Sequence, residues 1–182
     1  ANAPFDDLES MVDYAKANGP MTVAINASPH KLVLAAVGRE TGAEFEFVPT
    51  DGGAESMKLL LGGQVMASFA GGSHGPYLDS GDMKMIAVAN AERHDYAPDV
   101  KTVAEQGYGV YLDPYFYIAT TKGTDQAILD ALSNAISSAL ATDEVDEIVR
   151  NAAKASVLDL SPEETRSMMV DGMPIMEKLL GK

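Results

Sequence analysis

A short turn in the first third of the chain has the residue types of an anion-binding site. It consists of Thr50, Asp51, Gly52 and Gly53. The residues before the turn predict a strand that ends at Pro49, and residues 54–61 carry apolar side chains at helical spacing. The first N–H groups of a helix have no partner within it, and the helix dipole favours negative charge there. The turn therefore predicts a carboxylate site, although glycines can also serve only to make a turn tight.

A second strand–turn–helix junction comes earlier in the chain. Residues 22–26 predict a short strand, and Ser28 and Pro29 have the residue types of a helix N-cap and a first helical position. His30 follows them, and the helix dipole disfavours its protonated form, so that a neutral ring would be available to a ligand. A histidine that only forms a local hydrogen bond at the helix start is equally consistent with this pattern.

Residues 71–75 match the pattern G-x-S-x-G, which marks the nucleophile of α/β-hydrolases when it joins a strand to a helix. Ser73 would be that nucleophile, and the predicted strand 64–70 does precede it. However, Pro76 follows at once, and the only downstream histidine is His94. We therefore predict a ligand-facing loop here rather than a catalytic elbow.

Composition excludes several classes of function. The chain of 182 residues carries a formal charge of −14, and nucleic-acid binding requires a basic face. An anionic ligand must therefore be held by local donors against the overall field. The sequence contains no cysteine and no metal-ligand spacing, and we expect neither a metal nor a cofactor. No apolar run approaches the roughly 18 residues of a membrane span.

The chain up to residue 120 predicts alternating helices and strands. Residues 5–18 predict a helix in which Asp6 is the cap and Glu9 its partner. Residues 84–90 predict a buried strand. Residues 110–120 predict an aromatic strand that belongs to the core or a hinge.

After residue 123 the chain predicts amphipathic helices. They cover residues 124–141, 143–153 and 162–180, and the last begins with a capping box at Ser161 and bends near Gly172 and Pro174. Their apolar residues recur at helical spacing, as at Ile128, Leu132, Ile136 and Val149. The last helix also carries four methionines, for which core packing is the simplest explanation: Met168, Met169, Met173 and Met176.

The order of these motifs resembles that of the receptors of tripartite tricarboxylate transporters, the TctC-type or Bug proteins. Residues 48–54 (VPTDGGA) and 59–65 (LLLGGQV) resemble the central motif of that family. Further similar stretches are residues 14–18, 81–89, Arg93, 98–107 and 132–135. The sequence departs from the family pattern in two places. Thr50 and Asp51 stand in place of a tyrosine and a lysine, and Met66 stands in place of an aspartate.

The resemblance implies an α/β fold, a periplasmic-binding-protein-like lobe of type II (Venus-flytrap) with a central mixed sheet flanked by helices. Residues 1–120 would form the second, ligand-binding lobe. Residues 121–182 would form trailing helices that return to a first lobe, whose strands are absent from this sequence. On this basis we expect a fragment or trimmed form of a mature protein without its signal peptide. We also expect it to self-associate, because the trailing helices lack a surface to cover.

By the same resemblance, the protein would be a periplasmic receptor that captures a small organic carboxylate or an amino-acid-like solute and delivers it to the membrane subunits of a transporter. We expect no catalysis. The implied ligand-binding residues are Ser28, His30, Thr50, Asp51, Gly52, Gly53, Ala70, Gly71 and Ser73.

Two other functions remain open at this point. One is an α/β-hydrolase-like esterase that uses Ser73, and ester hydrolysis lost in Ser73→Ala would identify it. The other is a ligand-sensing domain for a signalling partner, which a neighbouring sensor-kinase gene would indicate.

Overall fold

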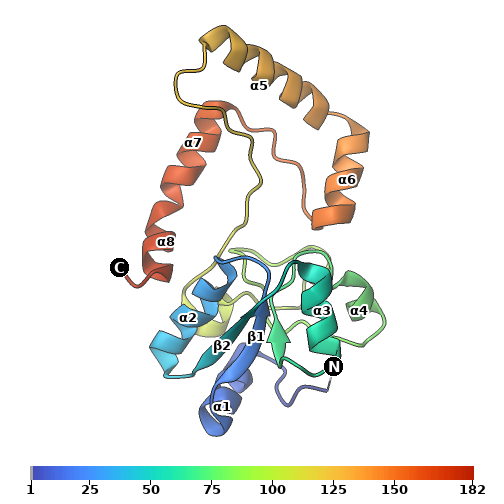
Figure 1. The fold of residues 1–182 in the computed structure, drawn as a ribbon, viewed down its shortest axis with the longest axis vertical. Coiled ribbons are helices and arrows are strands. Elements are labelled where there is room, and N and C mark those ends of the chain that lie inside the picture. Colours follow the sequence, from blue (N-terminus) through green and yellow to red (C-terminus); the bar gives the residue numbers. More distant parts are fainter. Residues whose placement is uncertain (1) are drawn as a thin grey trace. The chain divides into compact units, whose positions relative to one another are not determined.

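The computed structural model describes residues 2–182, and its first part alternates helices and strands (Figure 1). In order, the elements are α1 (Leu8–Asn18), β1 (Met21–Ile25), α2 (His30–Thr41), β2 (Phe45–Pro49), α3 (Gly53–Leu61), β3 (Ala67–Ser68) and α4 (Gly75–Asp79). A π-helical turn, η1 (Ala104–Tyr108), follows a long irregular segment. The remaining helices are α5 (Gln126–Leu140), α6 (Asp143–Ala153), α7 (Pro162–Asp171) and α8 (Met173–Leu179).

The sheet has the strand order β2-β1-β3, and both pairings are parallel. β1 pairs along its whole length with β2, from Met21 opposite Phe45 to Ile25 opposite Pro49. The sequence predicts a mixed sheet, whereas the strands assigned within residues 2–182 all run the same way. Because parallel crossovers are right-handed, α2 and α3, which connect strands in opposite directions across β1, cover opposite faces of the sheet.

The core lies mainly between β1 and the two helices α1 and α2. Its fully buried residues include Leu8 and Met11 of α1, Val23 of β1, and Val33 and Val37 of α2. These apolar positions recur at helical spacing in the sequence, so that each helix buries one stripe.

Two helix starts differ from the prediction in detail, and a third agrees with it. The N-cap of α1 is Asp7 instead of Asp6, and Ser10, rather than Glu9, completes its capping box. Pro29 occupies the N-cap position of α2, so that Ser28 does not cap this helix. The predicted capping box of Ser161 with Glu164 is present at α7. As predicted, the helical segment breaks near Gly172, between α7 and α8.

The predicted strands after α3 are shorter than expected or absent. Only Ala67 and Ser68 of the predicted strand 64–70 are assigned as β3. In residues 84–90 only Val88 forms a bridge, with Thr102. The Ile86 carbonyl accepts a hydrogen bond from the Gln106 side chain (3.0 Å) and not from a neighbouring strand. Residues 110–120 form no strand either. Val110 at the start of this segment is buried in the core, as predicted, but the aromatic residues Tyr115, Phe116 and Tyr117 are exposed and lie outside it.

The described chain divides into two compact units, residues 1–114 with 174–182 and residues 115–173. The sequence instead predicts a boundary at residue 120 and assigns the last helix to the second part. α8 belongs to the first unit because Leu179 is fully buried and the Arg39 guanidinium donates to its carbonyl (2.7 Å). Which unit forms which functional lobe stays a prediction.

In the second unit, α5, α6 and α7 bury no residue fully. Ile128 and Ile148 are 54% and 58% exposed. Met169 and Met173 are also exposed, so their predicted role as core filling is wrong. These amphipathic helices therefore lack the apolar surface that their sequence pattern requires.

Gln106 joins three segments of the first unit and gives a test of its stability. Its Oε1 accepts from the Leu8 N–H (2.8 Å), and its Nε2 donates to the carbonyls of Ile86 (3.0 Å) and Lys101 (3.2 Å). Since each such bond contributes about 1 kcal/mol, Gln106→Ala should lower the free energy of unfolding by about 2–3 kcal/mol in urea denaturation. The exposed Gln64 is the matched control, and Gln64→Ala should change it by less than about 0.5 kcal/mol. Equal effects of the two substitutions would contradict this role.

Candidate functional site

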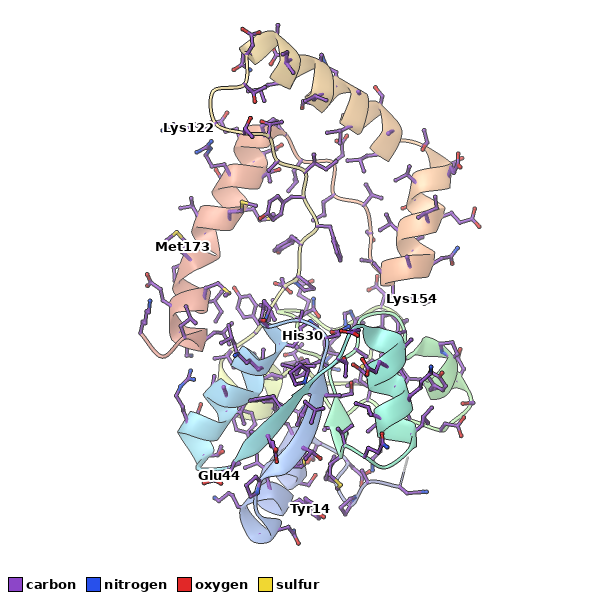
Figure 2. All side chains as sticks on the ribbon, in the orientation of Figure 1. Tyr14, His30, Glu44, Lys122, Lys154 and Met173 are labelled. Carbon is purple, nitrogen blue, oxygen red and sulfur yellow. The ribbon has the colours of Figure 1, made fainter. Side chains whose placement is uncertain are left out.

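The loops that follow the three strands meet at one edge of the sheet. Because the strands are parallel, their carboxyl ends lie together, which is where open α/β sheets bind ligands. Asn26 follows β1, Thr50 follows β2 and Phe69 follows β3. Figure 2 shows His30 at this end of the sheet and Glu44, which precedes β2, at the other end.

Ser73 and Asn26 come from two different loops, and both lie beside Gly53 at the start of α3. A Cβ added to Gly53 would lie 2.5 Å from the Ser73 Oγ and 3.8 Å from the Asn26 Nδ2. Only a residue without a side chain allows the start of α3 to approach Ser73 this closely. The structure thus brings the predicted residues Gly53 and Ser73 together with Asn26, which was not among the predicted site residues.

Three polar atoms at this edge are buried and have no hydrogen-bond partner within residues 2–182. They are Asn26 Oδ1, His30 Nδ1 and Ser73 Oγ. Buried polar atoms are nearly always hydrogen-bonded, so such a group requires an explanation. A polar ligand that bonds to these atoms would provide one.

The starts of α2 and α3 lie at the same edge, and neither has a side-chain cap. At α3 the N-cap is Gly52, so the first N–H groups of the helix are not bonded by a capping side chain. The four-residue turn therefore presents backbone donors, as the sequence predicts for an anion site.

Thr50 and Asp51 have different roles in this turn. The Thr50 N–H donates to the Ile25 carbonyl (2.9 Å), and its Oγ1 lies 2.6 Å from the Ser56 Oγ. Thr50 therefore fixes the turn to β1 and α3. Asp51 is exposed and does not cap α3; its N–H instead donates to the Glu55 Oε2 (2.7 Å). Asp51 and Glu55 thus place two carboxylates at the start of α3.

His30 stacks on Phe69, with ring centroids 5.4 Å apart and an interplanar angle of 16°. Burial lowers the pKa of His30 below its ordinary value of 6.5, so the ring is neutral near pH 7. A neutral ring presents one donor and one acceptor. The local packing therefore favours the neutral form of His30, which the sequence also predicts.

The remaining predicted residues belong to the loops at the same edge, and the Ser73 N–H donates to the Gly71 carbonyl (2.7 Å). Ser28 and Gly71 are exposed, and Ala70, next to Phe69, is half-buried. Asn26 could have been found from the sequence, because an amide directly after a buried strand is typical of the ligand edge of a parallel sheet.

The other two histidines form a cluster of their own. The His74 Nε2 lies 3.0 Å from the Tyr96 hydroxyl, and His94 stacks on Tyr96 with ring centroids 4.8 Å apart. His94 is therefore engaged with Tyr96, and Ser73 Oγ has no partner among the described residues that could act as its base. Among the described non-glycine residues only Lys154 has a positive φ, so the backbone of Ser73 does not have the strained conformation of a nucleophile elbow. This geometry does not support a nucleophile elbow.

Within the described part of the chain, no helix is long and apolar enough to cross a membrane. No group of three or more histidine, cysteine or acidic side chains in residues 2–182 could hold a metal ion.

Comparison with known proteins identifies similar sequences and folds. The family described as "Tripartite tricarboxylate transporter family receptor" matches residues 1–172. A "UPF0065 protein in gbd 5'region" of Cupriavidus necator is 31% identical over 143 residues, which cover 77% of this chain and 44% of that protein. Protein BugT of Bordetella pertussis is 30% identical over 174 residues, which cover 91% of this chain and 52% of BugT.

Solved structures with a similar fold also match this chain. A Rhodopseudomonas palustris protein with adipate has a TM-score of 0.78 and 22% identity, covering 98% of this chain and 61% of that one. A structure described as a periplasmic transporter has a TM-score of 0.81 and 22% identity, with coverage of 100% and 62%. The Rhodopseudomonas palustris protein MatC with bound malate has a TM-score of 0.67 and 22% identity, with coverage of 98% and 61%.

These comparisons confirm the resemblance read from the sequence and the periplasmic-binding-protein-like α/β fold. The matched family is one of receptors and not of enzymes. The chain spans about half the length of the curated relatives it matches.

The neutral state of His30 predicts a pH dependence of stability. Burial lowers the folded-state pKa of His30, so below about pH 6.5 the unfolded state binds more protons at this ring. The free energy of unfolding should therefore fall as the pH drops from about 6.5 towards the folded pKa, with no contribution above this range.

Urea denaturation at about pH 7.5 and 5.5 should show a smaller loss in His30→Asn than in the wild type. Burial also lowers the pKa of His94, but His94 is present in both proteins and its contribution cancels. Equal losses in the two proteins would contradict the buried neutral state of His30.

Proposed function

Because the chain belongs to the tripartite tricarboxylate transporter family of receptors, we propose that it is the solute-binding part of a periplasmic receptor. It would capture a small organic carboxylate and present it to the membrane subunits of a tripartite transporter in a Gram-negative bacterium. The observation that carries this proposal is the set of three unpartnered polar atoms, Asn26 Oδ1, His30 Nδ1 and Ser73 Oγ, beside the uncapped start of α3.

Each part of this edge has a role in the proposal. The carboxylate of the solute accepts hydrogen bonds from the Ser73 hydroxyl and from the first N–H groups of α3, since charge-assisted bonds of this kind are the stronger ones. The Asn26 Oδ1 is an acceptor and takes a hydrogen bond from a hydroxyl or amino group of the solute. Neutral His30 supplies a further donor or acceptor.

The charge of the turn limits the solute. Asp51 and Glu55 are both exposed at the start of α3, and the chain as a whole carries a charge of −14. A second carboxylate near this turn would be repelled, although water and salt weaken the repulsion. We propose a solute with one carboxylate at this lobe and a neutral or cationic remainder. The structural neighbours with adipate and malate are similar in fold, and their ligands support the broader carboxylate class.

Isothermal calorimetry on a full-length form, which includes the part of the relatives that this chain does not span, tests the limit set by charge. We expect a hydroxy or amino monocarboxylate such as lactate or alanine to bind more tightly than malate. Asp51→Asn should raise the affinity for malate about three- to tenfold, because one repulsive charge is removed.

Glu44→Gln is the matched control, because it removes the same charge at the opposite end of the sheet and should leave both affinities unchanged. Tight binding of malate by the wild type that Asp51→Asn does not alter would refute the charge argument. Failure of every carboxylate to bind would refute the receptor proposal itself.

The exposed helices of the second unit lead to a proposal about self-association. Ile128 and Leu132 of α5 are 54% and 43% exposed, and burying one such side chain stabilises by about 1.5–3 kcal/mol. We expect two or more copies of this chain to cover these residues.

Light scattering at micromolar concentration should therefore give a mass above that of one chain. The double substitution Ile128→Glu with Leu132→Glu should restore the monomer, whereas Asn134→Glu, an exposed polar position on the same helix, should not. A monomeric wild type would contradict self-association.

A further inference from the structure

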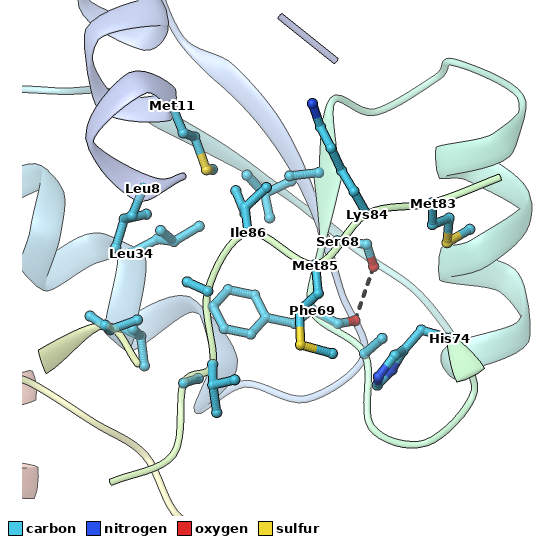
Figure 3. Close-up of a pocket in the computed structure, with 18 of the residues that line it drawn as sticks. Leu8, Met11, Leu34, Ser68, Phe69, His74, Met83, Lys84, Met85 and Ile86 are labelled. Carbon is cyan, nitrogen blue, oxygen red and sulfur yellow. Dashed lines mark hydrogen bonds between the residues drawn. The ribbon is translucent and has the colours of Figure 1, made fainter. Parts of the chain in front are cut away.

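An apolar cavity of about 180 Å³ lies within the first unit, beside β3 (Figure 3). Leu8, Met11 and Leu34 line one side of it, and Met83 and His74 the other, with Phe69 and Ile86 between them. The cavity reaches both faces of the sheet, since Leu60 of α3 and Met11 of α1 both line it.

The position of the cavity follows from the short edge strand. β3 is the outer strand of the sheet and has only two residues. Residues 84–87 lie next to β3 and form the opposite wall of the cavity. The backbone hydrogen bonds of this wall are made to residues other than those of β3. The Met83 N–H donates to the Tyr77 carbonyl (3.0 Å), Ile86 accepts from Gln106 (3.0 Å), and the Val88 N–H donates to Lys101 (3.0 Å). These three bonds tie the wall to residues outside β3, and the space beside β3 stays open.

The chemistry of the lining selects an apolar occupant. Most of the lining residues are apolar, and several of its polar groups already have partners. The Ser68 hydroxyl donates to the Phe69 carbonyl, Lys84 donates to the Ala3 carbonyl, and His74 bonds to Tyr96. An apolar cavity of roughly 150 Å³ stays dry and binds benzene, so this volume is sufficient for a group of that size.

We infer that this cavity is a binding pocket for a benzene-sized apolar molecule or group, separate from the polar atoms at the carboxyl edge. Such a group can be a free hydrocarbon, or it can be the apolar end of a solute whose carboxylate is bound at that edge. The position of Phe69 and Ala70 supports the second source, the apolar end of a bound solute, because both residues line the cavity and also belong to the loop of the candidate site. The pocket itself does not depend on the proposed receptor function.

The methionines provide a direct measurement. Met11, Met57, Met83 and Met85 line the cavity, whereas Met168, Met169 and Met173 lie in the second unit. In the protein labelled with ¹³C at the methionine methyl groups, benzene should shift the NMR signals of the first group in a saturable manner and leave those of the second group unchanged. Equal shifts in both groups, or no shift in the first, would overturn the inference.

Filling the cavity tests its location. Ala87 lines it, and Ala87→Leu should weaken benzene binding at least about tenfold, because the added side chain occupies the same space. Ala131→Leu, on the exposed face of α5, is the matched control and should bind benzene as the wild type does. Should Ala87→Leu not fold, Leu60→Phe provides a second filling variant with the same expected loss. A filled variant that folds and binds benzene normally would also overturn the inference.

Phenylacetate distinguishes the two sources of the apolar group. If the group belongs to a solute, phenylacetate should shift the same cavity methionines at lower concentration than benzene, and Ser73→Ala should remove this advantage without affecting benzene. If the source is a free hydrocarbon, benzene should bind more tightly than phenylacetate, and Ser73→Ala should have no effect. Benzene binding together with failure of all carboxylates in calorimetry would retain the pocket and reject the receptor function.

Discussion

The pairing of β1 with strands on both sides is the constraint on which the rest of the first unit depends. β1 is the middle strand, and its partners β2 and β3 run parallel to it. Parallel neighbours require helical crossovers, and right-handed crossovers place α2 and α3 on opposite faces. The same geometry brings the starts of both helices and the end of β3 to one edge. The unpartnered atoms of Asn26, His30 and Ser73 lie at one edge because of this topology, although Ser73 comes more than forty residues after the other two in sequence.

The sequence predicts the elements whose signals are local. Apolar spacing predicted α6 at its observed bounds, and the Ser161 capping box begins α7 as expected. Strands depend on pairing with distant residues, which a single sequence does not reveal. Residues 84–90 have a strong strand pattern, yet the Gln106 side chain takes the Ile86 carbonyl, and only Val88 forms a bridge.

The same distinction holds for the candidate site. The glycine turn and His30 could be selected from residue type and position, and the neutral histidine follows from burial. The role of Asn26 depends on its position beside Gly53, where Ser73 also lies, and this arrangement arises only when distant segments meet. Asp51 was expected to bind the ligand. Its hydrogen bond could not be predicted from residue type, because the acceptor of its N–H is the side chain of Glu55, one turn further on.

Phe69 and Ala70 belong to the loop of the polar candidate site and also line the apolar cavity. On one side of this segment, His30 stacks on Phe69 and carries an unpartnered nitrogen; on the other, Phe69 lines the apolar cavity. Phe69 directly follows the two-residue strand β3 and contributes to both environments. The end of β3 therefore links the polar edge of the sheet to the apolar space beside it.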